Sequence, residues 1–296
     1  MRRVGQDTRR QASEADRFRL AYERAGSGPA VVLLHGWPGD RADYRDMVPL
    51  LTSAADVVVP DLRGFGESDK HPADPAEQYT AAAQARSVIA LMEELELDRP
   101  VLAGYDIGSR IAQAIAREHP ELVRALVVAP PLPGIGDRIL QPDAQREFWY
   151  QSFHQLELCT ELMDGQPGAV RGYLRHFWSH WSGPDYELPA ADEDHLVSVY
   201  GSPGAFAASI AWYRGGAGSV AASLAEQAPE PDARISVPTD VLWPEHDPLF
   251  PRAWSDRLEE FFSDATLTRL DGAGHFTPRE APRAFADAIQ ARLPQS

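Results

Sequence analysis

The stretch "GYDIGS", residues 104–109, follows the apolar run "VLA" and precedes the helix-like stretch "RIAQAIAREH". Gly104 and Gly108 allow the backbone to turn tightly between a strand and a helix, and such a turn pushes the side chain of Asp106 out over the edge of a sheet. The start of the following helix favours negative charge at that position. An aspartate in such a turn is either a helix cap or a carboxylate presented for chemistry. The turn alone leaves both interpretations open.

Short apolar runs alternate with helical patterns around this turn. The runs are rich in valine and leucine and end in turn residues, as is typical of strands buried on both faces of a parallel sheet. They cover residues 30–36, 56–61, 100–106 and 124–130. Because stretches with helical spacing separate them, the sequence predicts an α/β fold, with a mostly parallel, twisted sheet flanked by helices.

The pattern changes after residue 131. Residues 141–227 carry helical patterns without a strand-like run, and strand-like runs return at 238–247 and 265–275. A helical block that interrupts an α/β sheet predicts a cap inserted into one core. The predicted division is core, helical cap and core, at residues 1–132, 133–231 and 232–296. We expect the polar first 16 or so residues to be loose.

Composition limits the classes of partner. The chain has 296 residues, 44% hydrophobic content and a net charge of −16, and such a charge repels phosphate backbones, which argues against nucleic acid. The single cysteine, Cys159, excludes an intramolecular disulfide and is expected to pack inside a cap helix. No apolar segment follows the N-terminal arginine pair within the distance typical of a signal peptide, and the run "AVVLLHG" is far too short to span a membrane. We therefore expect a cytoplasmic monomer or homodimer that binds a small molecule and water, and neither nucleic acid nor a membrane.

The interpretation of Asp106 as a nucleophile makes further demands on the chain. A carboxylate that displaces a leaving group from a saturated carbon forms an ester, and cleavage of this ester by water requires a base and an oxyanion hole. The stretch "HGWPGD" ends the first strong strand, and it can bring the N–H of Trp37 to one side of the ester carbonyl while the N–H of Ile107 serves the other.

Two late stretches can supply the base. "EHDP" (245–248) ends a strand and contains Asp247, and "GAGHF" (272–276) follows the last strand and contains His275. We expect His275 to activate water and Asp247 to orient the imidazole and stabilise its charged form. Glu245 is the alternative orienting carboxylate. The order Asp106, Asp247, His275 matches the nucleophile–acid–histidine order of the α/β-hydrolase fold.

With these motifs the chain resembles the aspartate-nucleophile branch of the α/β-hydrolase superfamily, which contains epoxide hydrolases, haloalkane dehalogenases and fluoroacetate dehalogenases. The resemblance runs from about residue 17 to the end of the chain. It is strongest in five stretches, "HGWPGD", "DLRGFGESDK", "GYDIGS", "WPEHDPLFP" and "GAGHFTP". We interpret the second of these, which begins with Asp61, as a structural loop that packs beside the site.

The leaving group separates the reactions of these enzymes. A halide leaves without a proton, whereas an epoxide oxygen leaves as an alkoxide and needs an acid, a role that suits a phenol with a pKa near 10. The stretches "EFWYQSFHQ" (147–155) and "IAWYRGG" (210–216) resemble the segments in which epoxide hydrolases carry paired cap tyrosines. This resemblance places Tyr150 and Tyr213 over Asp106. The alternative is that both rings only pack the cap.

The residue after the nucleophile argues against the dehalogenases. Haloalkane dehalogenases resemble many epoxide hydrolases in having tryptophan there, and fluoroacetate dehalogenases have arginine there with another arginine three positions on. This chain has Ile107 and Arg110. Ile107 offers no side-chain donor for a halide, although it also departs from the usual epoxide hydrolase pattern. Arg110 either matches the second arginine or lies on the helix surface.

We therefore predict an epoxide hydrolase, a hydrolase acting on ether bonds, that forms a vicinal diol through an ester on Asp106. This chemistry implies no metal and no organic cofactor. The alternatives are a dehalogenase on the same scaffold and a ligand-binding member without catalysis. Aromatic residues of the cap predict an apolar wall and a neutral, bulky or aromatic epoxide. The residues expected at the substrate pocket are Trp149, Gln151, Phe153, Trp178 and Trp212.

Overall fold

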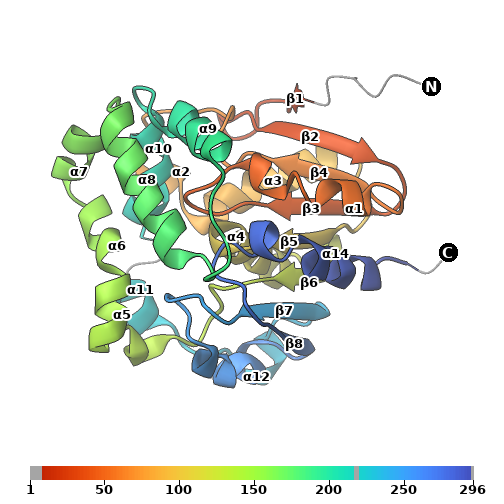
Figure 1. Cartoon of the computed structure of the whole chain (residues 1–296). Coiled ribbons are helices and arrows are strands. Elements are labelled where there is room, and N and C mark those ends of the chain that lie inside the picture. Colours follow the sequence, from red (N-terminus) through yellow and green to blue (C-terminus); the bar gives the residue numbers. More distant parts are fainter. Residues whose placement is uncertain (1–8, 217–219, 295–296) are drawn as a thin grey trace.

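The described residues form one eight-stranded sheet with the order β1-β2-β4-β3-β5-β6-β7-β8 (Figure 1). The computed structural model describes residues 9–216 and 220–294. The strands are β1 (Arg9–Gln11), β2 (Ala21–Gly26), β3 (Ala30–Leu34), β4 (Asp56–Pro60), β5 (Val101–Gly104), β6 (Ala125–Val128), β7 (Thr239–Pro244) and β8 (Ala265–Leu270). Strand β2 is antiparallel to β1 and β4, and the other pairs are parallel. The predicted α/β fold with a mostly parallel sheet is confirmed.

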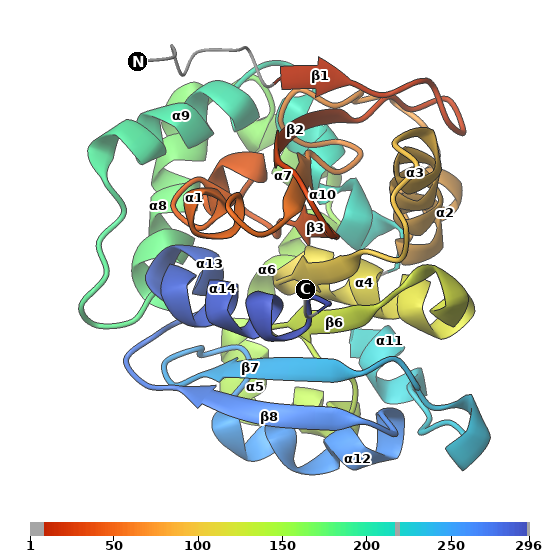
Figure 2. The ribbon, with the colours of Figure 1, turned by 90° about the vertical axis from the view of Figure 1, so that its right-hand side faces the viewer.

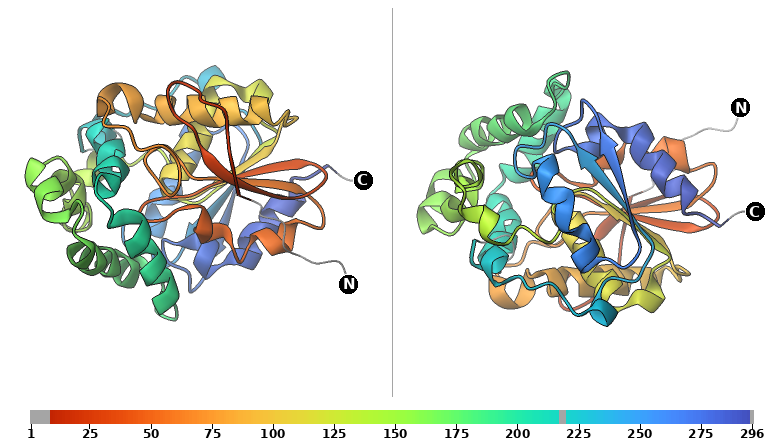
Figure 3. Two further views of the ribbon diagram at one scale, coloured as in Figure 1. Left: turned by 90° about the horizontal axis from the view of Figure 1, so that it is seen from above. Right: turned by 90° about the horizontal axis from the view of Figure 1, so that it is seen from below.

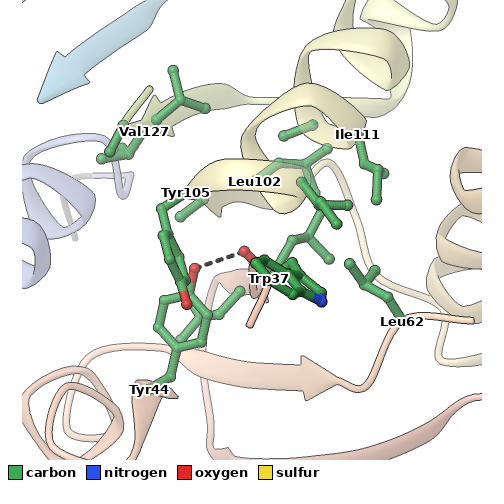
Figure 4. Close-up of a cluster of buried hydrophobic side chains, with 14 of the residues drawn as sticks. Trp37, Tyr44, Leu62, Leu102, Tyr105, Ile111 and Val127 are labelled. Atoms are coloured by element: carbon green, nitrogen blue, oxygen red, sulfur yellow. Dashed lines mark hydrogen bonds between the residues drawn. The ribbon is translucent and has the colours of Figure 1, made fainter. Parts of the chain in front are cut away.

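The central strands are buried on both faces, which explains their continuous apolar runs. Every residue of β3, β5 and β6 is buried. In the register of the sheet, Val31 lies beside Val101, and Val101 lies beside Ala125. Tyr44 adds a polar contact, since its hydroxyl donates a hydrogen bond to the carbonyl oxygen of Leu34 at 2.7 Å. Figure 4 shows Tyr44 with other side chains of this buried cluster.

The N-terminal edge of the sheet differs from the sequence-based expectation. Residues 9–11 form β1 instead of a loose segment, and residues 1–8 of the stretch expected to be loose lie outside the described residues. Strand β2 was also not predicted. Both strands lack a long apolar run, because β1 is exposed throughout and only the first two residues of β2 are buried. An edge strand with exposed side chains carries little hydrophobic signal.

Helices cover both faces of the sheet. Helix α3 (Ala81–Glu94) packs against α4 (Asp106–Glu118) on one face, and α1 (Val48–Leu51) packs against α14 (Pro282–Ala291) on the other (Figures 2 and 3). The shorter helices outside the insertion described next are α2 (Pro75–Gln78), α12 (Leu258–Phe261) and α13 (Thr277–Glu280). The sheet and its helices therefore form three layers, and the ends of the central strands remain free to carry a site.

A block of helices separates β6 from β7 in the chain and gathers at one end of the sheet (Figure 1). These are α5 (Pro142–Glu147), α6 (Trp149–His154), α7 (Glu157–Met163), α8 (Pro167–Trp181), α9 (Ala190–Tyr200), α10 (Ala205–Arg214) and α11 (Val220–Ala225). We call them the inserted helices. Cys159 is buried within α7. The division at residues 132 and 231 stays a prediction, and residues 217–219 and 295–296 lie outside the described part.

The inserted helices cover the carboxyl end of β3. The indole Nε1 of Trp178 donates to the carbonyl oxygen of Pro38 at 3.0 Å, and the hydroxyl of Tyr200 donates to that of Gly39 at 2.6 Å. Both acceptors lie in the loop that follows β3. Within residues 9–216 and 220–294, no helix combines the length and apolarity needed to cross a membrane.

Candidate active site

Asp106 lies at a tight turn between β5 and α4, in a conformation that side chains seldom adopt. Its φ is +49°, and a residue other than glycine held there costs roughly 1–3 kcal/mol. The glycines of the motif permit the turn: a Cβ on Gly104 would lie 2.6 Å from the carbonyl carbon of Gly108, and one on Gly108 would collide with the carbonyl oxygen of Leu34. This turn places Asp106 at the start of α4 with its carboxylate lining a cavity, although the residue is buried.

The Asp106 carboxylate accepts a hydrogen bond from a backbone donor outside its own helix. Oδ1 lies 2.7 Å from the amide nitrogen of Trp37, in the loop after β3. The amide of Ile107 belongs to the first turn of α4, where N–H groups have no acceptor within the helix, and Ile107 lines the same cavity as Asp106. The structure therefore places the Trp37 N–H, one of the two predicted oxyanion donors, at the Asp106 carboxylate, and it places Ile107 beside the same cavity. The side chain of Asp106 makes no capping hydrogen bond within α4.

His275 and Asp247 reach the same point from the ends of β8 and β7. His275 Nδ1 lies 2.8 Å from Asp247 Oδ2, and the other oxygen of Asp247 accepts the N–H of Leu249 at 2.9 Å. His275 Nε2 lies 3.4 Å from Asp106 Oδ2 and makes no hydrogen bond with a described residue. His275 is 1% exposed. This geometry orients one ring nitrogen towards Asp247 and leaves the other facing Asp106.

Charge dominates the protonation of His275. Burial lowers the pKa of His275, but the nearby charges of Asp247 and Asp106 outweigh burial and raise this pKa to about 10. In the resting site an imidazolium therefore lies between two carboxylates. Any reaction that neutralises Asp106 removes one of the two charges that hold the proton on His275.

Two other carboxylates, those of Glu245 and Asp61, bind groups other than His275. Glu245 is exposed, and its Oε2 accepts the N–H of Gly272 at 2.9 Å. Asp61 is buried and accepts the backbone N–H groups of Arg41 and Glu67 at 2.9 and 2.8 Å, and it also forms an ion pair with the Arg41 guanidinium. Neither side chain is bonded to His275, so the structure favours Asp247 as the orienting acid and a structural role for Asp61.

Tyr150 of α6 and Tyr213 of α10 lie side by side in the cavity that contains Asp106. Their ring centroids are 5.6 Å apart, with the planes at 89°. Both rings contact the indole of Trp37, at 5.7 and 5.9 Å. Burial raises the pKa of both phenols far above the usual value, and the charge of Asp106 raises them further. Both hydroxyls are therefore protonated, and the two phenols also form a hydrogen bond with each other.

The cavity has a volume of about 330 Å³. Of the five residues predicted at the substrate pocket, Gln151 and Trp212 line it together with the two tyrosines. The other apolar lining residues include Ile107, Ile135, Ile139, Phe148 and Phe250. The predicted apolar wall exists, but Ile135 and Ile139 come from the segment after β6, which no motif marked, and Phe250 comes from the loop after β7.

Three of the predicted pocket residues lie elsewhere. Trp149 is 41% exposed on the outer side of α6, and Phe153 packs beside it with a centroid distance of 6.0 Å. Trp178 is buried against the core, where its ring stacks on Phe276 at 3.6 Å. The prediction for these three residues is wrong, because aromatic residues occupy both the inner and the outer faces of α6 and α8 and composition alone does not distinguish them.

Arg110 has a partner that the sequence did not reveal. Its guanidinium lies 3.5 Å from Glu226 Oε1, just after α11, and both residues line the cavity. The second oxygen of Glu226 accepts the N–H of Gly134 at 2.6 Å. Since the two residues are far apart in the chain, no local signal marks the pair. Among the described residues, no group of three or more histidine, cysteine or acidic side chains could hold a metal ion.

Sequence and structure comparisons show similarity to proteins of the alpha/beta hydrolase fold. A family model described as alpha/beta hydrolase fold matches residues 29–282. A soluble epoxide hydrolase of a Corynebacterium species is 29% identical over 91% of this chain and 92% of its own length. Haloalkane dehalogenase 2 of Mycobacterium tuberculosis is 27% identical over 95% and 93%. The solved structure of the epoxide hydrolase CorEH without ligand is 26% identical, with a TM-score of 0.81 over 96% of this chain and 97% of that one.

Proposed function

The chain belongs to the family of the alpha/beta hydrolase fold, and from that premise we propose that it is an epoxide hydrolase. It converts a neutral, bulky or aromatic epoxide to a vicinal diol through an ester on Asp106. The observation that carries this proposal is the pair of buried phenols, Tyr150 and Tyr213, in the same cavity as Asp106. An epoxide oxygen needs such donors when the ring opens, and a departing halide does not.

In the first step Asp106 attacks one carbon of the epoxide and the bond from that carbon to the ring oxygen breaks. The Trp37 N–H holds Oδ1 at 2.7 Å, so Oδ2 is the attacking atom. Tyr150 and Tyr213 donate hydrogen bonds to the ring oxygen, and one of them transfers its proton to the forming alkoxide. The products of this step are an alkyl ester of Asp106 and a phenolate.

In the second step His275 becomes the base. The ester carries no negative charge, so the pKa of His275 falls, and its proton returns to the phenolate. Neutral His275 then takes a proton from water, and the hydroxide attacks the ester carbonyl. The N–H groups of Trp37 and Ile107 stabilise the oxyanion. Collapse of the intermediate releases the diol, whose oxygen takes the imidazolium proton, and the new Asp106 carboxyl returns its proton to His275.

The dehalogenase alternative finds less support in this cavity. The side chain of Ile107 cannot donate a hydrogen bond to a halide, and Arg110 is engaged with Glu226 at 3.5 Å. A haloacetate needs a free cation for its carboxylate. The similarity to a haloalkane dehalogenase at 27% identity nevertheless makes halide release the essential comparison in any assay.

The length of the cavity supports a substrate that carries a long or bulky group beside the epoxide ring. Asp106, Ile107, Arg110, Ala114 and Arg117 follow one another along one face of α4, and all of them line the cavity. At a rise of about 1.5 Å per residue, the stretch from the first to the last spans about 16 Å. The reactive end lies at the tyrosines, and the apolar middle of the cavity fits a hydrocarbon or aromatic body.

The deciding experiment measures products across a panel of aryl, alkyl and polycyclic epoxides by mass spectrometry, with a haloalkane panel and fluoroacetate in parallel. Diol formation above the level of the Asp106→Ala variant supports the proposal. Halide release without diol formation would replace it with the dehalogenase. No turnover of any panel member, with the cavity shown to bind one of them, would favour a ligand-binding protein.

The His275→Gln variant tests the covalent step. Because His275 acts only on the ester, this variant should alkylate and then stop. Intact-protein mass spectrometry should show the mass of one whole epoxide added, on a peptide that contains Asp106. An unmodified protein after incubation with a proven substrate would refute the two-step mechanism.

A further inference from the structure

Glu280, at the end of α13, holds the loop that carries His275. Its Oε2 accepts the backbone N–H groups of Gly274 and Gly183, each at 2.7 Å, and its Oε1 accepts the N–H of Phe276 at 2.9 Å. Gly274 and Phe276 are the two neighbours of His275 in the chain. One carboxylate therefore clamps the backbone on both sides of the histidine and connects it to the segment that follows α8.

The same loop also contacts the end of α8 through its backbone. The N–H of His275 donates to the carbonyl oxygen of Trp181 at 2.8 Å. A Cβ on Gly274 would collide with that oxygen and with the amide nitrogen of Gly183, so the loop and the end of α8 touch through their backbones. Glu280 is the side chain that satisfies the donors of both segments at this contact.

We propose that Glu280 is a positioning residue for the catalytic base, which fixes the His275 backbone so that Nε2 faces Asp106 and Nδ1 faces Asp247. The role in ester hydrolysis rests on the proposed function, whereas the role in orienting the imidazole does not. Three charge-assisted hydrogen bonds to one carboxylate define the loop more tightly than neutral contacts would. Without the carboxylate, the N–H groups of Gly274, Phe276 and Gly183 lose their acceptor.

The surroundings of Glu280 act on its pKa in opposite directions. Burial raises the pKa of Glu280 above its usual value, and this effect outweighs the three backbone N–H groups and the positive charge of His275, which lower the pKa. Glu280 is not one of the residues that line the substrate cavity.

The test compares Glu280→Gln with a matched control, Asp164→Asn. Asp164 also accepts two backbone N–H groups, those of Gly204 and Ala207 at 2.7 and 3.1 Å, but it lies among the inserted helices and has no contact with His275. Glutamine keeps the size of the side chain and one acceptor oxygen. Its NH₂ group takes the place of the other oxygen and cannot accept a hydrogen bond from the backbone N–H groups there. Both variants lose comparable local hydrogen bonds, so a general loss of stability affects both.

Single-turnover kinetics should separate the two steps in these variants. A displacement of a catalytic group by about 1 Å costs about 10²-fold in rate, so ester hydrolysis in Glu280→Gln should slow by up to that factor while alkylation remains near the wild-type rate. The ester should then accumulate, and Asp164→Asn should leave the ratio of the two rates unchanged. Equal slowing of both steps in Glu280→Gln, or no slowing of hydrolysis, would overturn the proposal.

A second measurement needs no substrate. The proton between His275 Nδ1 and Asp247 should give a low-field proton NMR signal, assigned by its loss in His275→Gln. We expect Glu280→Gln to shift or broaden this signal and Asp164→Asn to preserve it. An unchanged signal in Glu280→Gln would refute the positioning role. Failure of the wild-type protein to form an ester would refute only the proposed function.

Discussion

Replacing Asp106 by asparagine should bring the pKa of His275 from about 10 down towards the ordinary histidine value near 6.5. Asparagine has the size of aspartate and, like the proposed ester intermediate, carries no charge. In the wild-type protein the Asp106 carboxylate lies 3.4 Å from Nε2. Two unit charges at this separation attract by about 5 kcal/mol at an effective dielectric constant of about 20. A loss of about 1.4 kcal/mol already weakens proton binding tenfold.

The assay is an NMR titration of ¹³Cε1-labelled histidine from about pH 5 to about pH 11, with His275 assigned through His275→Gln. The wild-type ring should stay charged well above neutral pH, and the ring of Asp106→Asn should titrate near neutrality. Glu245→Gln is the control, because this exposed residue lies close in sequence to Asp247 and is bonded to Gly272. Identical titration curves for wild type and Asp106→Asn would refute the idea that ester formation converts His275 into a base.

Three further predictions follow from the site. Tyr150→Phe and Tyr213→Phe should each slow alkylation, and the double variant should lose about 10²–10⁴-fold; rapid-quench measurement of the ester at the wild-type rate in the double variant would make both rings packing residues. Glu226→Gln releases Arg110 from its ion pair. KM should then fall roughly tenfold for an epoxide that carries a carboxylate and stay constant for the neutral methyl ester of that epoxide. Equal changes in KM for both substrates would show that Arg110 does not reach the substrate. The pKa of His275 is about 10 in the folded state and near 6.5 in the unfolded state, so the proton on His275 stabilises the fold fully below about pH 6.5, and this stabilisation is lost as the pH rises towards 10. Thermal unfolding should therefore show that the wild type loses stability relative to His275→Gln between these pH values. Parallel stability curves for the two proteins would contradict the charged state of His275.

The sequence alone determined the framework of the site. Buried parallel strands need continuous apolar runs, and the turn at Asp106 needs small residues at positions 104 and 108, so both features are visible as local patterns. The positions of Asp247 and His275 could be predicted for the same reason, since each follows a strand-like run within a short motif. The edge strand β1 and its neighbour β2 escaped prediction because neither carries a long run of buried apolar side chains.

The tertiary structure decided which side chains of the inserted helices face the cavity. On α6, Gln151 lines the cavity while Trp149 is on the outer surface. Aromatic residues occur on both sides of this helix, so hydrophobicity does not reveal its rotation about its own axis. The rotation is set by packing against Trp37 and against the neighbouring helices, which bring together residues distant in the chain.

The contact between Glu280 and the His275 loop was likewise beyond the reach of sequence analysis. Its acceptor is one glutamate among many charged residues, and its donors are backbone N–H groups, which almost every residue carries. Only the fold brings the amides of Gly183, Gly274 and Phe276 within 2.9 Å of this carboxylate. Side-chain chemistry is written in the sequence, whereas the direction of a backbone donor is determined by the path of the chain in space.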